Sequence, residues 1–62
     1  MATIEEDLVP FLKEKGEQYP GMRAYLQDTY ENALAEVEDG ESEDNEVELA
    51  MQDVNNYIAE QD

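Results

Sequence analysis

Residues 43–58, EDNEVELAMQDVNNYI, decide the fold because their apolar side chains recur at spacings of three and four residues. This spacing places them on one face of an α-helix, and no useful length of strand-like alternation occurs anywhere in the chain. Ser42 to Asp44 supply residues suited to the N-cap position. We therefore predict a helix over about residues 43–60. Its buried face would consist of Val47, Ala50, Met51, Val54, Tyr57 and Ile58.

A second helix is predicted over about residues 20–38. Pro20 stands near its start, where the fixed backbone angle of proline suits a first helical turn. Gly40 follows its end, where glycine suits the left-handed position beyond a helix C-terminus. Its apolar stripe would consist of Met22, Leu26, Tyr30, Ala33, Leu34 and Val37.

The N-terminal segment is also predicted to form a helix, over about residues 3–15. Thr3 and Glu6 match a capping box, and Gly16 is interpreted as its stop. Pro10 conflicts with a regular helix, because an internal proline costs about 3 kcal/mol. Either the helix kinks at Pro10, or its regular part begins near Asp7 with Pro10 in the first turn, and the sequence leaves both options open.

The expected fold class is therefore all-α, with residues 1–62 forming one small three-helix bundle. A net charge of -15 is typical of disordered chains, but a hydrophobic fraction of 40% and three periodic segments favour a folded one. The core would hold only about a dozen apolar side chains, and a chain this small commonly needs a partner or a homodimer for full stability.

The composition excludes several functions. The chain has no histidine and no cysteine, so it lacks the usual neutral-pH base, thiolate nucleophile and zinc ligands, and we expect neither an enzyme nor a cofactor. Three basic residues are too few to neutralise phosphates, which argues against direct nucleic-acid binding. No apolar run is long enough to enter a membrane. The acidic N-terminus does not resemble a secretory signal, and the expected location is cytoplasmic.

The distribution of charge is more informative than its total. Lys13, Lys15 and Arg23 are the only bases, whereas residues 24–62 contain 13 acids. Like charges three or four residues apart on a helix destabilise it, so this pattern indicates a role outside the fold. We predict an acidic ridge that binds a basic partner, with Tyr25 and Leu49 as apolar anchors. The ridge acids would be Glu36, Glu38, Asp39, Glu41, Glu43, Asp44, Glu46 and Glu48, extended by Asp28, Glu31 and Asp53.

In size, charge and charge clustering, residues 24–62 resemble the small acidic DNA-mimic proteins of phages and mobile elements. That resemblance implies inhibition of a DNA-binding protein, with uracil-DNA glycosylase, restriction enzymes, CRISPR effectors and nucleoid proteins as candidate targets. It rests on no diagnostic motif. Phage inhibitors of uracil-DNA glycosylase carry a Glu-Ser-Ile element on a strand, whereas here Glu41 and Ser42 are followed by Glu43 in an expected helix.

Two alternatives lie outside the DNA-mimic class. The chain could be an acidic helical accessory or adaptor protein that oligomerises or docks through its apolar stripe. The acidity could also serve only solubility or adaptation to a salt-rich cytoplasm. The salt dependence of binding distinguishes the DNA mimic from the adaptor. Affinity that depends on charge falls as ionic strength rises, whereas affinity that depends on apolar contact does not.

Overall fold

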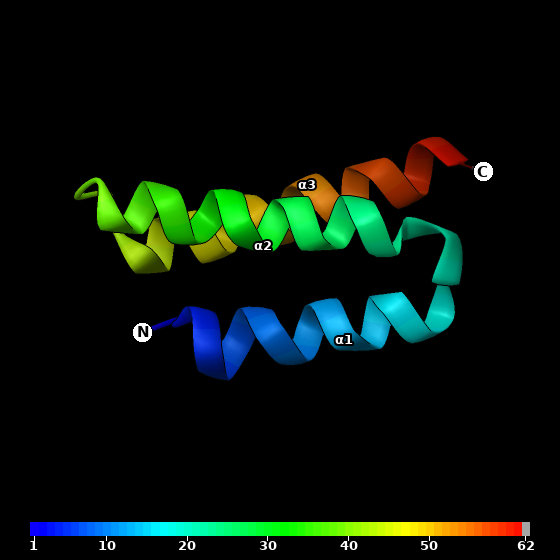
Figure 1. The fold of residues 1–62 in the computed structure, drawn as a ribbon, viewed down its shortest axis with the longest axis horizontal. Coiled ribbons are helices and arrows are strands. Elements are labelled where there is room, and N and C mark those ends of the chain that lie inside the picture. Colours follow the sequence, from blue (N-terminus) through cyan, green and yellow to red (C-terminus); the bar gives the residue numbers. More distant parts are fainter. Residues whose placement is uncertain (62) are drawn as a thin grey trace.

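A computed structural model describes residues 1–61, and it confirms the predicted all-α three-helix bundle. The chain runs through a helical turn η1 (Ile4–Leu8), α1 (Val9–Gln18), a short 3₁₀ turn η2 (Pro20–Met22), α2 (Arg23–Glu38) and α3 (Glu43–Gln61). Figure 1 shows the three helices lying side by side in alternating directions. The second and third helices lie where the sequence predicts them, and the first extends three residues further than expected.

The first helix changes from π-helical to α-helical geometry just before Pro10. The five residues of η1 form a π-helical turn, and regular α-helix begins only at Val9, with Pro10 in the first turn of α1. α1 continues from η1 without a gap, and the Val9 N–H donates to the Ile4 carbonyl five residues earlier. The wider π-helical turn therefore lies directly before Pro10, the residue that cannot donate to the preceding turn. Of the two options left open by the sequence, the structure has the second, with the start at Val9 instead of near Asp7.

Thr3 caps this helix, but the capping box differs from the prediction. The Thr3 hydroxyl accepts a hydrogen bond from the Glu6 backbone N–H at 3.1 Å, as expected. The carboxylate that accepts the Thr3 N–H belongs to Asp7, at 2.9 Å, and not to Glu6. The wider π turn brings the fourth helical residue, rather than the third, back over the cap.

Gly16 does not end the first helix, contrary to the prediction, because α1 continues through it to Gln18. Pro20 sets the boundary instead. A proline disfavours helical backbone angles in the residue before it, and Tyr19 has φ −132° and ψ 74°. Gly16 is buried where α1 approaches α2, and a Cβ atom there would lie 3.6 Å from Leu26 Cδ1.

The turn between α2 and α3 is closed by hydrogen bonds at both of its ends. The N–H of Glu41 donates to the Glu36 carbonyl at 3.0 Å and that of Gly40 to the Val37 carbonyl at 3.1 Å, which is a Schellman motif. Gly40 has φ 106°, the left-handed conformation that the sequence predicts for it. Ser42 then caps α3, accepting from the Asn45 N–H at 3.4 Å.

The core lies along the axis between the three helices and uses the predicted stripes. Leu34 is an exception, with an exposed fraction of 36%, because it is displaced by one residue, about 100°, from buried Ala33. Thr29 is the buried polar residue, and its hydroxyl donates to the Tyr25 carbonyl at 2.9 Å. The buried apolar residues are Ile4, Leu8, Leu12, Met22, Leu26, Ala33, Val47, Ala50 and Val54.

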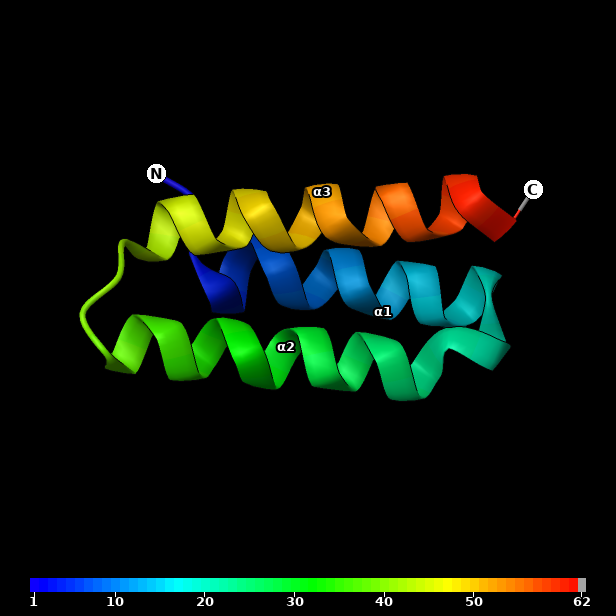
Figure 2. The same ribbon diagram turned by 90° about the horizontal axis from the view of Figure 1, so that it is seen from above.

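The bundle is an elongated rod of 34 × 19 × 19 Å. Figure 2 shows α2 and α3 running antiparallel, with α1 beneath the space between them. The turn η1 packs on the start of α3, and α1 packs mainly on α2. The N-terminus and the α2–α3 turn therefore lie at one end of the rod, and the α1–α2 connection lies at the other.

Candidate functional site

The alternating directions of the helices gather acids from two separate stretches of the chain, residues 5–7 and 36–48, at one end of the rod. We call this end the acidic pole. It combines the η1 turn, the last turn of α2, the α2–α3 connection and the first two turns of α3. Its members are Glu5, Glu6, Asp7, Glu36, Glu38, Asp39, Glu41, Glu43, Asp44, Glu46 and Glu48, eleven of the 18 acids in the chain.

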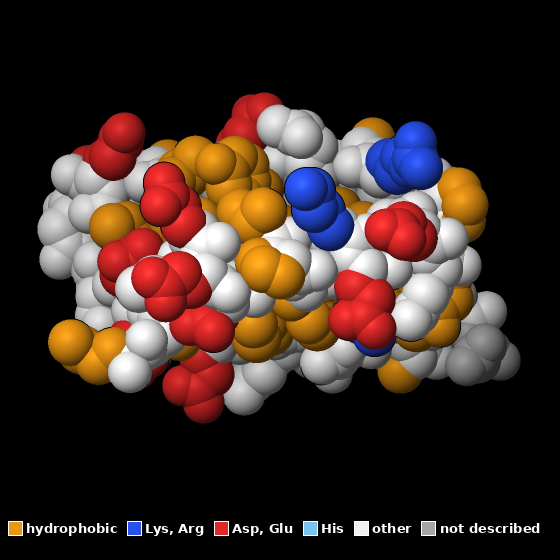
Figure 3. All heavy atoms as spheres, turned by 90° about the horizontal axis from the view of Figure 1, so that it is seen from below, with side chains coloured by type: hydrophobic (Ala, Val, Ile, Leu, Met, Phe, Trp, Pro, Cys, Tyr) orange, Lys and Arg blue, Asp and Glu red, His pale blue; other side chains and the backbone are white. Residues whose placement is uncertain are grey.

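The three bases lie away from this pole. Lys13 and Lys15 lie near the middle of α1, and Arg23 begins α2 at the opposite end of the rod. Figure 3 views the molecule from the α1 side and shows acidic side chains gathered at one end, an apolar strip beside them, and Lys and Arg side chains towards the other end. The molecule is therefore electrically polarised along its length as well as strongly negative.

Glu5, Glu6 and Asp7 are members of the pole that the sequence-based prediction did not include. They are about forty residues from Glu43 along the chain, but η1 packs directly on the start of α3. A three-helix bundle with short connections must return its third helix beside the start of its first. The predicted topology therefore already places these acids beside the start of α3, whereas the run of acids along the sequence does not indicate it.

Besides Asp7, which caps η1, two acids of the pole from α3 have a structural task. The Glu43 carboxylate accepts a hydrogen bond from the Ile4 backbone N–H at 2.8 Å, and the Asp44 carboxylate accepts from the Ala2 N–H at 2.7 Å. Backbone N–H groups at the start of a helix lack intrahelical partners, and anions beside them are stabilising. Glu43 and Asp44, which the sequence assigned to partner binding, thus join α3 to the N-terminus.

A shallow groove between α2 and α3 brings several predicted site residues together. Glu36 reaches it from α2, and Glu46 and Asp53 reach it from α3, so three carboxylates surround a floor made partly of alanine. Leu49 lies on the same groove and is 50% exposed. The complete lining is Thr29, Asn32, Ala33, Glu36, Glu46, Leu49, Ala50 and Asp53, around a volume of about 330 Å³.

Tyr25 lies at the interface between the same two helices and is half-buried. Its hydroxyl donates a hydrogen bond to the Asp53 carboxylate at 2.5 Å, and its ring stacks on that of Tyr57 with 4.2 Å between centroids. The pKa of Tyr25 is raised to about 12, mainly by the hydrogen bond to Asp53 and to a smaller extent by partial desolvation. The predicted anchor therefore joins α2 to α3.

Asp28 and Glu31 lie on the exposed surface of α2, outside the acidic pole. Ten residues separate Asp28 from the end of α2, which corresponds to about 15 Å along the helix. Glu31 accepts a hydrogen bond from the Gln27 side chain one turn earlier, at 2.9 Å. The structure therefore does not bring these two predicted residues together with the other acids.

The described part of the chain contains no group of three or more acidic side chains arranged to hold a metal ion. Within residues 1–61, no helix combines the length and the apolar character needed to cross a membrane. The chain matches no protein-family model, and no curated protein or solved structure is significantly similar to it. The function is therefore inferred from the geometry and charge of the surface.

Proposed function

We propose that this protein is a DNA mimic, which binds the basic nucleic-acid site of a DNA-binding protein or enzyme and keeps DNA out of it. The acidic pole would replace phosphates, and the α2–α3 groove would receive basic side chains of the partner. The observation that carries this proposal is the gathering of eleven acids from two separate stretches of the chain at one end of the rod. Uracil-DNA glycosylase, restriction enzymes, CRISPR effectors and nucleoid proteins are the target classes to test.

The overall density of charge supports this proposal. A net charge of -15 spread over a rod 34 Å long is one charge per about 2.3 Å. Duplex DNA carries one charge per about 1.7 Å of its axis when both strands are counted. The rod is also about as long as one turn of B-DNA, roughly 34–36 Å. A protein surface built for duplex phosphates would therefore meet a comparable field.

The α2–α3 groove provides a means of selecting among basic partners. A lysine or arginine side chain has an apolar stem and a charged end, and it can lay the stem on apolar surface while its charge stays at the rim. Here Ala33, Ala50 and Leu49 offer the apolar surface, and Glu36 and Glu46 offer carboxylates beside it. This combination favours a protein partner over free counterions, which need no apolar contact.

The accessory or adaptor alternative receives less support. It requires an apolar stripe that is free to dock, but most of the α2 and α3 stripes form the core of the bundle itself, and of the α2 stripe only Leu26 and Tyr30 line an open groove beside α1. Tyr19, Leu34 and Leu49 are exposed apolar side chains, and they come from the α1–α2 connection, α2 and α3 respectively. Adaptation to salt accounts for many acids, but it does not account for their concentration at one end.

The test is a competition between this protein and duplex DNA. The immobilised full-length chain is incubated with host lysate, with and without excess duplex DNA, and the retained protein is identified by mass spectrometry. The purified target is then bound to labelled DNA and titrated with this protein while the anisotropy of the label is followed. We expect DNA to be displaced, with an affinity that falls as salt is raised.

Two charge-matched variants locate the binding surface. The first neutralises four acids of the pole (E36Q, E38Q, E41Q and E48Q), and the second neutralises four acids outside it (E14Q, E17Q, D28N and E60Q). Both lose four negative charges, and we expect only the first to lose most of its inhibition. Equal loss of inhibition in both variants would show that binding depends on net charge and not on the pole. A target that stays bound in excess duplex DNA would refute mimicry.

A further inference from the structure

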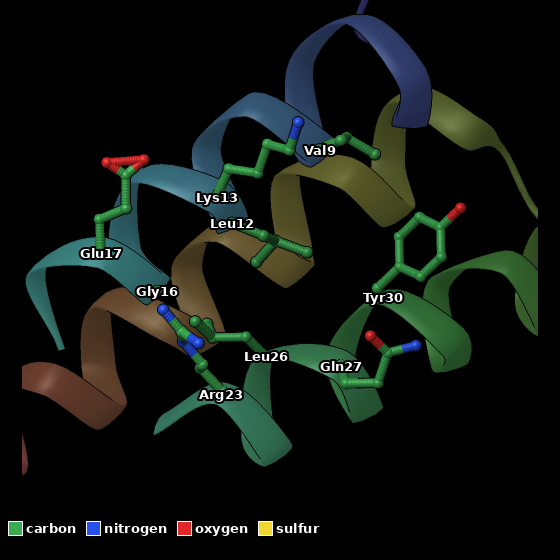
Figure 4. A pocket seen from close by; sticks show the side chains of 9 residues that line it. All are labelled: Val9, Leu12, Lys13, Gly16, Glu17, Arg23, Leu26, Gln27 and Tyr30. Carbon is green, nitrogen blue, oxygen red and sulfur yellow. The ribbon is translucent and has the colours of Figure 1, made fainter. Parts of the chain in front are cut away.

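A second groove lies between α1 and α2, away from the acidic pole. Its volume is about 570 Å³, within the range of about 300–1,000 Å³ that is typical of binding pockets. Figure 4 shows the apolar side chains of Leu12 and Leu26 between the two helices, with Tyr30 to one side. The groove is lined by Val9, Leu12, Lys13, Gly16, Glu17, Arg23, Leu26, Gln27 and Tyr30.

This groove carries two of the three bases in the chain. Lys13 stands on the α1 wall and Arg23 on the α2 wall, so that cations flank the apolar floor from both sides (Figure 4). Glu17 is the one acid in the lining. In a protein with 18 acids, this is a place where the local charge favours an anionic group. By contrast, the α2–α3 groove is lined by three acids and no base.

The shape of the groove fits a helix. Its α1 wall runs from Val9 to Glu17 and its α2 wall from Arg23 to Tyr30, so each wall is about 10–12 Å long at 1.5 Å per residue. Two turns of a partner helix span the same length and present apolar side chains at positions i, i+4 and i+7. Gly16 is buried and forms part of the lining where α1 approaches Leu26 and Arg23 of α2.

We propose that the α1–α2 groove binds an amphipathic helix of a protein partner, which places leucine-like side chains on the half-buried Val9 and Tyr30 beside the mostly buried Leu12 and Leu26, and carboxylates beside Lys13 and Arg23. The partner is thus acidic along the edges of its apolar face, the opposite of the partner proposed for the acidic pole. The helix would pack across α1 and α2 as an additional member of the bundle. The protein then has two binding surfaces with opposite charge preferences.

The test uses a synthetic helical peptide of about 15 residues, about 22 Å long. It has leucine at i, i+4, i+7 and i+11, glutamate at the flanking positions and blocked ends. The acidic pole repels this peptide, so its binding reports on the groove independently of the proposed DNA mimicry. Titration into the ¹⁵N-labelled full-length chain should shift the backbone amide signals of Leu12, Gly16 and Leu26, leaving those of Glu41 and Glu48 in place.

Matched controls separate groove binding from general attraction. Lys13→Gln and Lys15→Gln make the same change of charge on the same helix, but Lys15 lies over the Phe11 ring, 5.5 Å from its centroid, and does not line the groove. An exposed ion pair corresponds to about a two- to fivefold change in affinity. We therefore expect K13Q and R23Q each to weaken binding by that factor and K15Q to leave it unchanged.

A second peptide, with glutamine in place of the flanking glutamates, tests the charge preference of the groove. It should bind at least about threefold more weakly, because it forms neither ion pair. Equal affinities for the two peptides, equal effects of K13Q and K15Q, or amide shifts confined to other residues would each overturn the proposal. Lys13 and Lys15 are both on the surface of α1, so these variants should keep the fold.

Discussion

The backbone N–H of Ile4 donates a hydrogen bond to the carboxylate of Glu43, 39 residues further along the chain, at 2.8 Å. Ile4 is buried, and its N–H belongs to the first turn of η1, where no intrahelical acceptor exists. The first residue of α3 therefore stabilises the first residue of η1. This contact fixes the N-terminal segment to the acidic pole and brings Glu5 and Glu6 into it.

Removing this contact should destabilise the fold more than removing a similar charge nearby. We expect Glu43→Ala to lower the free energy of unfolding by about 1–2 kcal/mol, because it leaves the Ile4 N–H without its acceptor. Glu48→Ala is the matched control, since Glu48 lies exposed on the same helix and removes the same charge. Urea denaturation followed by circular dichroism measures both, and equal effects would show that the Ile4–Glu43 hydrogen bond contributes nothing.

The hydrogen bond between Tyr25 and Asp53 should contribute a smaller amount. Tyr25→Phe keeps the stacking on Tyr57 but removes the hydroxyl that donates to Asp53. We expect a loss of about 0.5–1.5 kcal/mol in the free energy of unfolding, typical of one hydrogen bond. Tyr57→Leu tests the stacked ring separately, by removing it while Tyr25 and Asp53 remain. A Y25F variant as stable as the natural protein would contradict this prediction.

The raised pKa of Tyr25 predicts how the stability of the fold depends on pH in the alkaline range. The pKa of Tyr25 is raised from 10.0 to about 12, so the folded state holds the phenolic proton more tightly than the unfolded chain does. The resulting stabilisation is complete below pH 10 and is lost as the pH rises towards 12. Urea denaturation at several pH values should show the advantage of the natural protein over Y25F shrinking across this interval. A constant difference would contradict it.

Local patterns in the sequence were sufficient for the helices but not for all of their ends. Both Gly16 and Gly40 follow a predicted helix, yet only Gly40 adopts a positive φ, 106°, and ends one. The helix α1 continues through Gly16 and ends only at Gln18, because Pro20 disfavours helical backbone angles at Tyr19. The acids Glu5, Glu6 and Asp7 were missed for another reason, since membership of the pole depends on packing between segments distant in the chain.

These two glycines should respond in opposite ways to the same substitution. In Gly16→Ala the new Cβ atom makes ordinary contacts with Leu26 and Arg23, and alanine favours a helix interior over glycine by about 0.5–1 kcal/mol. In Gly40→Ala it meets no neighbour, but the positive φ costs alanine about 1–2 kcal/mol. Thermal denaturation should therefore show a higher midpoint for G16A and a lower one for G40A, and a destabilised G16A would mean that the α1–α2 approach is closer than described.

The acidic pole should cost stability even while it serves binding. Like charges on neighbouring helical turns repel by about 0.2–0.5 kcal/mol per pair, and salt screens this repulsion. We expect the free energy of unfolding to rise as salt is added, and to rise less in the pole variant (E36Q, E38Q, E41Q and E48Q) than in the variant neutralised elsewhere (E14Q, E17Q, D28N and E60Q). The pole variant should also be more stable than the natural protein at low salt, although it binds its partner less. If the stability of the natural protein does not depend on salt, the acids carry no cost, and their concentration at one end does not require an external role.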